Sequence, residues 1–421
     1  MSFKLITLIV IVLGVVALAQ LVRVYELSSK LRNRREEDIS NRDNRLNGNM
    51  MLLFMFIMFG GFIWLMMKYG WTGRGVAASV HGETTDWLLN LNLIIIIIVF
   101  FFTNSLLFYF TFKYVRKPGV KAYFFPHDNK LELLWTVVPA IVLAVIIILG
   151  LKTWNDVTAD SKKEAIKIEL FSKQFDWTAR YAGTNNILGG FDYKLTTQEN
   201  ELGLMTSESL DSAIMLMQVG KADGSIMGIK QLEEKLNNPK NIFIPEDREK
   251  MVNDLDRKTR LVRMLIQMKA RYNKKKDAHA YDDIIQKDTL HLCVNKDYEL
   301  TFRAKDVIHS AYFPHFRAQM NTVPGLTTRL KMNPKYTTAQ MREKNNNPKF
   351  NYVLMCNKIC GSAHYKMKMI VVVDTPAQYK AWLKSKEKQT FKDVFLAAPA
   401  PAAEVPAEGA APADTLKMAS K

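Results

Sequence analysis

Four long apolar runs lie within the first 155 residues, and they restrict the fold more than any other feature of the chain. Each run has about 18 residues or more, which is long enough for an α-helix to cross a bilayer. A helix satisfies its own backbone hydrogen bonds in lipid, so we predict four membrane-spanning helices. They cover residues Leu5–Val22, Met50–Met67, Leu88–Phe112 and Leu131–Leu151.

The first run also has the features of a secretory signal peptide, because Lys4 precedes it and Ala17-Leu18-Ala19-Gln20 lies near its end. We interpret it as a true membrane span.

The orientation of the spans follows from the connecting loops, since Lys and Arg concentrate in cytoplasmic loops. Residues 23–45 hold seven Lys and Arg and residues 113–130 hold five, whereas residues 68–87 hold only Lys68 and Arg74. The first and third connections are therefore predicted to be cytoplasmic. The N-terminus and everything after Leu151 would then lie outside, in the periplasm if the membrane is a bacterial inner (plasma) membrane.

Beyond Trp154 the sequence changes to short runs in which apolar and polar residues alternate, a pattern that indicates β-strands. A Pro324-Gly325 turn separates two of these runs, and many short strands joined by turns are typical of a Greek-key all-β domain. The predicted strands are Ile166–Leu170, Phe175–Trp177, Leu290–Val294, Tyr298–Arg303, Thr327–Met332 and Met369–Val373.

Residues 184–288 are more than a small β-domain needs, and they contain a helix signal. Pro245 and the following acidic residues mark a helix start, and Lys269 and Arg271 mark its end. The segment is either a helical insertion packed on the β-domain or a docking arm for another subunit, and we favour the docking arm. An apolar stripe is expected at Val252, Leu255, Val262, Leu265 and Met268.

Composition excludes several classes of protein. The chain has 421 residues, a formal net charge of +17 and only three cysteines, so a disulfide framework is excluded. Cys293 lies in a strand-like run and is expected to be a core residue. There is no Cys-x-x-Cys-His sequence for attaching haem c, and no nucleic-acid-binding motif accompanies the positive charge. A basic surface would instead favour an acidic donor or anionic lipid headgroups of the bilayer.

Two thiols, an imidazole and a thioether fall within twelve residues, at Cys356, Cys360, His364 and Met367. His309 adds a second imidazole from an earlier segment. Soft sulfur ligands with imidazoles suit copper, and poorly suit magnesium or calcium. A structural zinc site with two Cys and two His ligands is the alternative that these residue types leave open.

Two separated motifs and a hairpin carry a resemblance to a known family. Residues 306–310 (DVIHS), residues 356–367 (CNKICGSAHYKM) and the helix start at Glu132–Ala140 (ELLWTVVPA) resemble subunit II of cytochrome c oxidase. The resemblance implies a cupredoxin-like Greek-key barrel that holds a binuclear copper centre (CuA, two Cu). Cys356 and Cys360 would bridge two copper ions. The other ligands implied are His309, His364, Met367 and the backbone carbonyl of Lys358.

The resemblance implies further roles. Glu132 matches the carboxylate at the mouth of a proton-uptake path, and residues 172–177 match an aromatic stretch where electrons enter, here with Phe175 and Trp177. Phe175 replaces the usual Trp, which suggests a different docking patch or a permanently held donor. Lys358 and Asn321 replace acidic residues that help to bind magnesium, so that ion is expected to be absent or bound differently.

The fold class we predict is therefore membrane α-helical hairpins with four spans, followed by an all-β cupredoxin-like Greek-key barrel with a helical insertion. The expected domains are residues 1–69 (an added hairpin), 70–155 (the subunit II hairpin), 156–395 (the copper domain with its insertion at 184–288) and 396–421 (a disordered Ala/Pro-rich tail).

The expected function is electron transfer from a cytochrome c, or a haem c domain of a partner complex, to haem in oxidase subunit I. There oxygen is reduced and protons are pumped. The alternatives are a quinol oxidase subunit II, which lacks the copper ligands, and a membrane-anchored protein for copper delivery or sensing.

Overall fold

The computed structural model describes residues 3–31, 39–70 and 73–395. The predicted disordered tail at 396–421 lies outside the described residues. The chain divides into two compact units, one made of Met1–Arg74 and Leu88–Ile148 and the other of Gly75–Trp87 and Leu149–Lys421.

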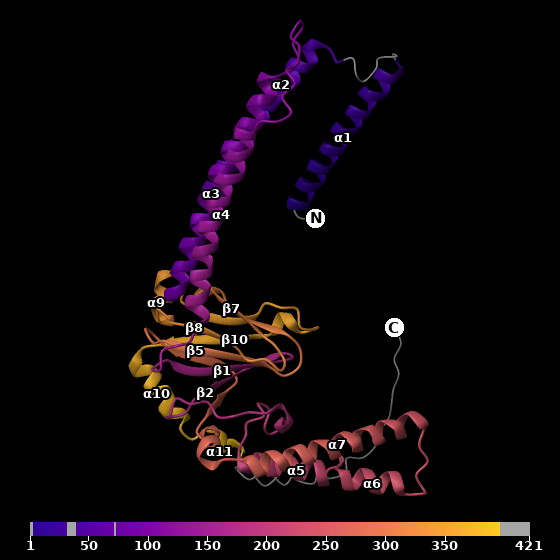
Figure 1. Ribbon diagram of the computed structural model, residues 1–421, viewed down its shortest axis with the longest axis vertical. Coiled ribbons are helices and arrows are strands. Elements are labelled where there is room, and N and C mark those ends of the chain that lie inside the picture. The colour runs from indigo at the N-terminus through magenta and orange to yellow at the C-terminus, as the bar shows by residue number, and fades with distance from the viewer. Residues whose placement is uncertain (1–2, 32–38, 71–72, 396–421) are drawn as a thin grey trace, which may run out of the picture. The chain divides into compact units, whose positions relative to one another are not determined.

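Four helices contain the four apolar runs (Figure 1). Each is long and apolar enough to cross a membrane, which confirms the four predicted spans. Their bounds are α1 Phe3–Leu31, α2 Asn41–Tyr69, α3 Val80–Lys113 and α4 Asn129–Thr158.

Helices α2 and α3 pack against each other in opposite directions. The rings of Phe54 and Phe108 are 5.7 Å apart. A Cβ added at Gly48 would lie 2.8 Å from Cγ1 of Val115, so the absence of a side chain allows close approach. Earlier residues of α2 therefore contact later residues of α3, so the two helices are antiparallel. The start of α2 and the end of α3 therefore share one end of the pair, as the two basic connections require.

The second unit contains two five-stranded sheets that enclose one core. The strand orders are β3-β2-β1-β5-β8 and β4-β10-β9-β6-β7. The pairs β1–β5 and β4–β10 are parallel, and the other pairs are antiparallel. Sheet neighbours distant in sequence confirm the predicted cupredoxin-like Greek-key class. The strands are β1 Ile166–Lys173, β2 Asp176–Tyr181, β3 Ile284–Gln286, β4 Thr289–Cys293, β5 Tyr298–Ala304, β6 His309–Phe313, β7 Ala318–Thr322, β8 Thr328–Met332, β9 Tyr352–Cys356 and β10 Lys368–Asp374.

The core forms because alternate side chains of each strand point inward. Ile168 and Leu170 of β1 meet Leu354 of β9 and Val371 of β10, and all four are fully buried. Cys293 is 3% exposed and belongs to the same core, as predicted.

The predicted strand at Phe175–Trp177 is wrong at its first residue. Lys173 of β1 pairs with Asp176 of β2, so Gln174 and Phe175 form the tight turn of this hairpin. The alternation of residue types did not reveal this turn, because it contains neither Gly nor Pro.

Residues 184–288 contain three longer helices and then rejoin the sheet through β3, which pairs with β2. The helices are α5 Ser207–Val219, α6 Ile229–Asn237 and α7 Pro245–Arg271, and α5 and α7 share a small core of their own. The predicted helix start and end at Pro245 and Arg271 are confirmed. The remaining helices of the unit are α8 Lys274–Asp277, α9 Thr338–Lys344, α10 Pro376–Lys386 and α11 Phe391–Phe395.

The apolar stripe predicted for α7 is wrong at Val252, whose side chain is 40% exposed. The covered face of α7 follows Met251, Lys258, Val262 and Leu265. Residues at this spacing lie on one face of a helix. Val252 follows Met251 by one residue, so its side chain points away from that face.

A buried cluster of charged side chains joins the sheet to both ends of the helical segment. Glu169 of β1 pairs with Arg180 of β2 and with Arg303 of β5, and Arg180 also pairs with Asp283 at 3.3 Å. Each of these four residues is less than 10% exposed. Arg303 also donates to the carbonyl of Leu202 at 3.1 Å. Sequence patterns missed this cluster because charged residues on strands usually face solvent.

Replacing Glu169 with Gln is expected to cost about 3–5 kcal/mol of unfolding free energy, because it removes the carboxylate that pairs with buried Arg303 and one of the two that pair with buried Arg180. The measurement is denaturant unfolding of the purified full chain, followed by tryptophan fluorescence. Asp256→Asn, which removes the carboxylate of an exposed ion pair on α7, is the matched control and should change little. Equal effects of the two substitutions would contradict the assigned role of Glu169.

Candidate metal centre

Two strand ends and one loop bring the predicted ligands to the same end of the sandwich. His309 begins β6 and Cys356 ends β9, and these neighbouring strands pair at Ala311 and Cys356. The chain then loops away and returns to β10. The amide of Cys356 donates to the carbonyl of Met367 at 3.1 Å, which closes the loop.

The two cysteine sulfurs lie at the middle of this arrangement, 3.8 Å apart. Nδ1 of His309 is 3.9 Å from the sulfur of Cys356, and Nδ1 of His364 is 3.5 Å from that of Cys360. Each thiol thus has one imidazole beside it. His309, Cys356 and Cys360 present ligand atoms that all lie within 4.8 Å of one another.

Two weaker donors complete the set, again one for each sulfur. The thioether sulfur of Met367 is 3.8 Å from the sulfur of Cys360, and the carbonyl oxygen of Lys358 is 3.2 Å from that of Cys356. The structure therefore brings together all six groups that the sequence suggested. The side chain of Lys358 points elsewhere and is exposed.

Asp306 orients the first imidazole. Its Oδ1 lies 2.9 Å from Nε2 of His309, and its Oδ2 accepts from the amide of Gln174 at 2.8 Å. Burial tends to raise the pKa of Asp306, but the Gln174 amide and the His309 ring donate to it and hold the pKa below its usual value. A proton on Nε2 leaves Nδ1 free to bind a metal ion.

Burial and the hydrogen bond with Cys356 together raise the pKa of the Cys360 thiol to about 11, so this thiol carries a proton in the absence of metal. A bound metal ion would displace that proton, because the thiolate is the ligand.

The geometry and the chemistry of the donors fit copper. The sulfur separation of 3.8 Å is less than twice a metal–thiolate bond of about 2.3 Å, so one ion can contact both sulfurs. Cys, His and a weak Met ligand are the combination found in copper electron-transfer sites. His309, Cys360 and Met367 are each at most 5% exposed, which keeps water from most of the ligand set.

Phe175 and Trp177 both lie beside this centre. Trp177 is fully buried, and its ring centre is 6.3 Å from that of His309. Phe175 packs over Gly361, where an added Cβ would lie 2.8 Å from Cζ of the Phe175 ring. Gly361 also has φ +138°, a conformation that favours glycine. Sequence reasoning missed Gly361, although its position between the ligands Cys360 and His364 was a usable signal.

Glu132 belongs to the other unit, in the first turn of α4. Its side chain is 45% exposed, and its Oε1 lies 3.6 Å from Nδ1 of His127. Asn321, on β7, is exposed.

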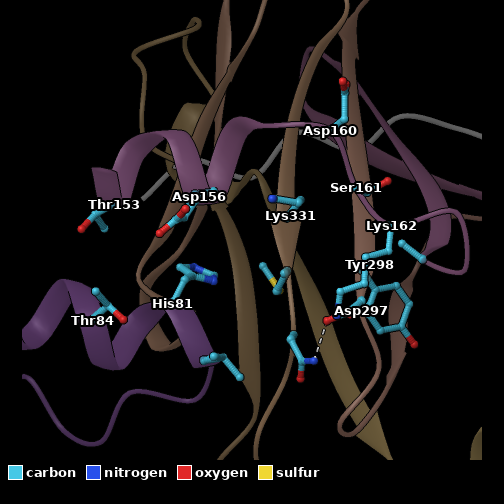
Figure 2. A pocket seen from close by; sticks show the side chains of 15 residues that line it. His81, Thr84, Thr153, Asp156, Asp160, Ser161, Lys162, Asp297, Tyr298 and Lys331 are labelled. Atoms are coloured by element: carbon cyan, nitrogen blue, oxygen red, sulfur yellow. Dashed lines mark hydrogen bonds and ion pairs between the residues drawn. The ribbon is translucent and has the colours of Figure 1, made fainter. Parts of the chain in front are cut away.

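A separate cavity of about 300 Å³ lies among α3, α4, β5 and β8 within the second unit. Figure 2 shows His81 of α3 and Asp156 of α4 together on one side of it. On its lining, the side chain of Asn333 donates to Asp297 at 2.8 Å. Among the residues that the structure describes, the converging group of three His, Cys or acidic ligands is the one at His309.

Comparison with known proteins finds similarity to one family. Residues 70–153 match the transmembrane domain of cytochrome c oxidase subunit II. The alternative cytochrome c oxidase subunit 2 of Bradyrhizobium diazoefficiens is 24% identical over 305 residues, which cover 72% of this chain and 79% of that protein. This chain is therefore similar to subunit II of cytochrome c oxidase, most clearly across its third and fourth helices. Helices α1 and α2 precede the matched region and are additional to it.

Two further subunit II proteins are similar over shorter stretches or in structure. Cytochrome c oxidase subunit 2 of Thermostichus vulcanus is 34% identical over 102 residues, 24% of this chain and 27% of that protein. The periplasmic domain of subunit II from Bradyrhizobium japonicum overlaps with a TM-score of 0.27 at 14% identity, covering 55% of this chain and 99% of that domain.

Replacing Asp306 with Asn is expected to weaken copper binding by about 10- to 100-fold, the usual effect of losing a partner that orients a ligand. The measurement is copper retention by the purified chain against a chelator of known affinity. Asp374→Asn is the matched control, because Asp374 pairs with His291 at 2.8 Å in the same domain, away from the candidate ligands. Unchanged retention in the Asp306 variant would contradict the orienting role.

Proposed function

We propose that this chain accepts electrons from a cytochrome c donor at a binuclear copper centre and passes them to haem in oxidase subunit I, where oxygen is reduced and protons are pumped. One observation carries the proposal. Two cysteine sulfurs lie 3.8 Å apart, and each has its own imidazole and its own weaker donor. Such a paired set suits two metal ions better than one.

The chain's own residues would hold this centre rigid. Cys356, Cys360, His309 and Met367 would be among the residues that hold the two ions. When bound, the copper pair supplies one-electron transfer. The hydrogen bond that closes the loop and the pairing of β6 with β9 fix the ligand positions, so little rearrangement should accompany a change of charge.

Apolar side chains around the candidate centre suit a docked protein. Ile359 is 86% exposed, Tyr365 is 76% exposed and Ile308 is 43% exposed. Exposed apolar groups of this kind mark interaction surfaces. The donor would be a cytochrome c, or a haem c domain of a partner complex. Phe175 in place of Trp fits a donor that is held in place.

The rest of the proposal concerns location. Two basic connections at one end of the α2–α3 pair support a cytoplasmic position for that end. The copper domain and the N-terminus would then face the periplasm from a bacterial inner membrane. Oxidase subunit I and other oxidase subunits would be the partners within the membrane.

Replacing Cys356 with Ser is expected to abolish both the near-infrared absorption of the copper pair and electron transfer from reduced cytochrome c, because a hydroxyl is a poor bridging ligand for copper. The measurements are the absorption spectrum and the cytochrome c oxidation rate of the assembled complex. Cys293→Ser, a buried cysteine outside the site, should retain both. Retained absorption and turnover in the Cys356 variant would contradict the proposed function.

The resemblance to subunit II implies that Glu132 takes up protons at the cytoplasmic side, and its half-exposed carboxylate at the start of α4, beside His127, is compatible with that role. Glu132→Gln is expected to slow oxygen consumption by the assembled oxidase several-fold while leaving the copper absorption unchanged. A control in the same unit is Glu26→Gln, an exposed carboxylate on α1. Normal turnover of the Glu132 variant would rule out this role.

The magnesium ion of related oxidases is expected to be absent or bound differently here, because Lys358 cannot ligate a cation and Asn321 carries no charge. Elemental analysis of the purified complex should find no stoichiometric magnesium held by this chain. Magnesium that is lost on Asn321→Ala would contradict this expectation.

A further inference from the structure

The loop between α3 and α4 combines positive charge with exposed aromatic rings. Four cations line an open hollow of about 1100 Å³ formed by this loop, together with the rings of Tyr114 and Tyr123. The four are Lys113, Arg116, Lys117 and Lys121.

The loop must lie at a membrane surface if α3 and α4 span the bilayer, because it joins the end of one to the start of the other. Helix α2 brings further charge to the same place. Gly48 of α2 packs against Val115 of the loop. Arg42 and Arg45 precede Gly48 on the first turns of α2, so they lie at the same end of the helix pair as the loop.

In the part of the chain that the structure describes, Arg116, Lys117 and Lys121 are exposed and pair with no carboxylate. Two described acidic groups near the loop are engaged elsewhere. Asp128 accepts from the amides that begin α4, and Glu132 lies beside His127.

Exposed rings accompany these charges. Tyr123 is 85% exposed, Phe124 is 84% exposed and Phe125 is 55% exposed. Amphipathic and aromatic rings of this kind favour the interface between lipid tails and headgroups. The charge of a cytoplasmic loop alone would set topology, but it would require neither three consecutive exposed rings nor a hollow lined by cations.

We propose that residues 113–125 bind the phosphate headgroup of an anionic phospholipid. Lys and Arg side chains in the hollow would contact the phosphate, and the rings at 123–125 would enter the interface beside it. Clusters of Lys and Arg next to a membrane span attract anionic lipid in this way. The inference uses only α2, α3, α4 and their loop, so it is independent of the copper centre.

The test uses the full chain in mild detergent, exposed to equal amounts of phosphatidylglycerol and phosphatidylcholine. Native mass spectrometry counts the lipids that remain bound. The wild-type chain should retain phosphatidylglycerol in preference, and high salt should remove that preference. Equal retention of the two lipids by the wild-type chain at low salt would overturn the proposal without any variant.

Variants then locate the site. Lys117→Gln and Lys121→Gln should each weaken phosphatidylglycerol retention by about fivefold, the effect of one cation near an anionic surface. The charge-keeping changes Lys117→Arg and Lys121→Arg should preserve it. Arg260→Gln on α7 removes the same charge from the other unit and should have no effect.

Three outcomes of the variants would overturn the proposal: undiminished retention after both Gln substitutions, an equal loss in the Arg260 variant, or displacement of the lipid by inorganic phosphate as readily as by added phosphatidylglycerol. The last result would indicate a soluble phosphate ligand instead.

Discussion

The separation of the Cys356 and Cys360 sulfurs is the constraint on which the rest of the site depends. The pairing of β6 with β9 places His309 beside Cys356, and the hydrogen bond from the Cys356 amide to Met367 closes the loop that carries Cys360. Both connections belong to the backbone, so the ligand positions do not rely on a metal ion to form. A preformed soft site of this kind favours electron transfer, since the protein has little to rearrange when the charge changes.

The hairpin turn at Gln174 and Phe175 supports that site from the opposite sheet. Gln174 donates its backbone amide to Asp306 and its side chain to the carbonyl of Cys360, so one residue steadies both the arm that carries His309 and the loop. Phe175 covers Gly361 in the same loop. The turn that matches the family's aromatic stretch therefore has a structural role at the centre, whether or not electrons pass through it.

Sequence patterns predicted the elements well where periodicity was strong, and the rare residue types of the candidate ligand set pointed to side chains that the fold brings together. Four apolar runs, six strand regions and the helix from Pro245 to Arg271 all appear in the structure. Three features could not be predicted. The turn at Phe175 carries no Gly or Pro to mark it. The burial of Glu169 depends on two arginines from other strands, and the need for glycine at 361 depends on a ring from the β1–β2 hairpin, both of which are contacts between segments separated in sequence. The exposure of Val252 was a smaller error, one residue off the buried face of α7.

The most direct test of the central claim is a count of copper and of unpaired electrons in the purified chain. The account predicts two copper ions per chain that share one unpaired electron in the oxidised state, seen by electron paramagnetic resonance as a single delocalised signal. One copper per chain with a localised signal, or a stoichiometric zinc ion with no signal, would contradict it.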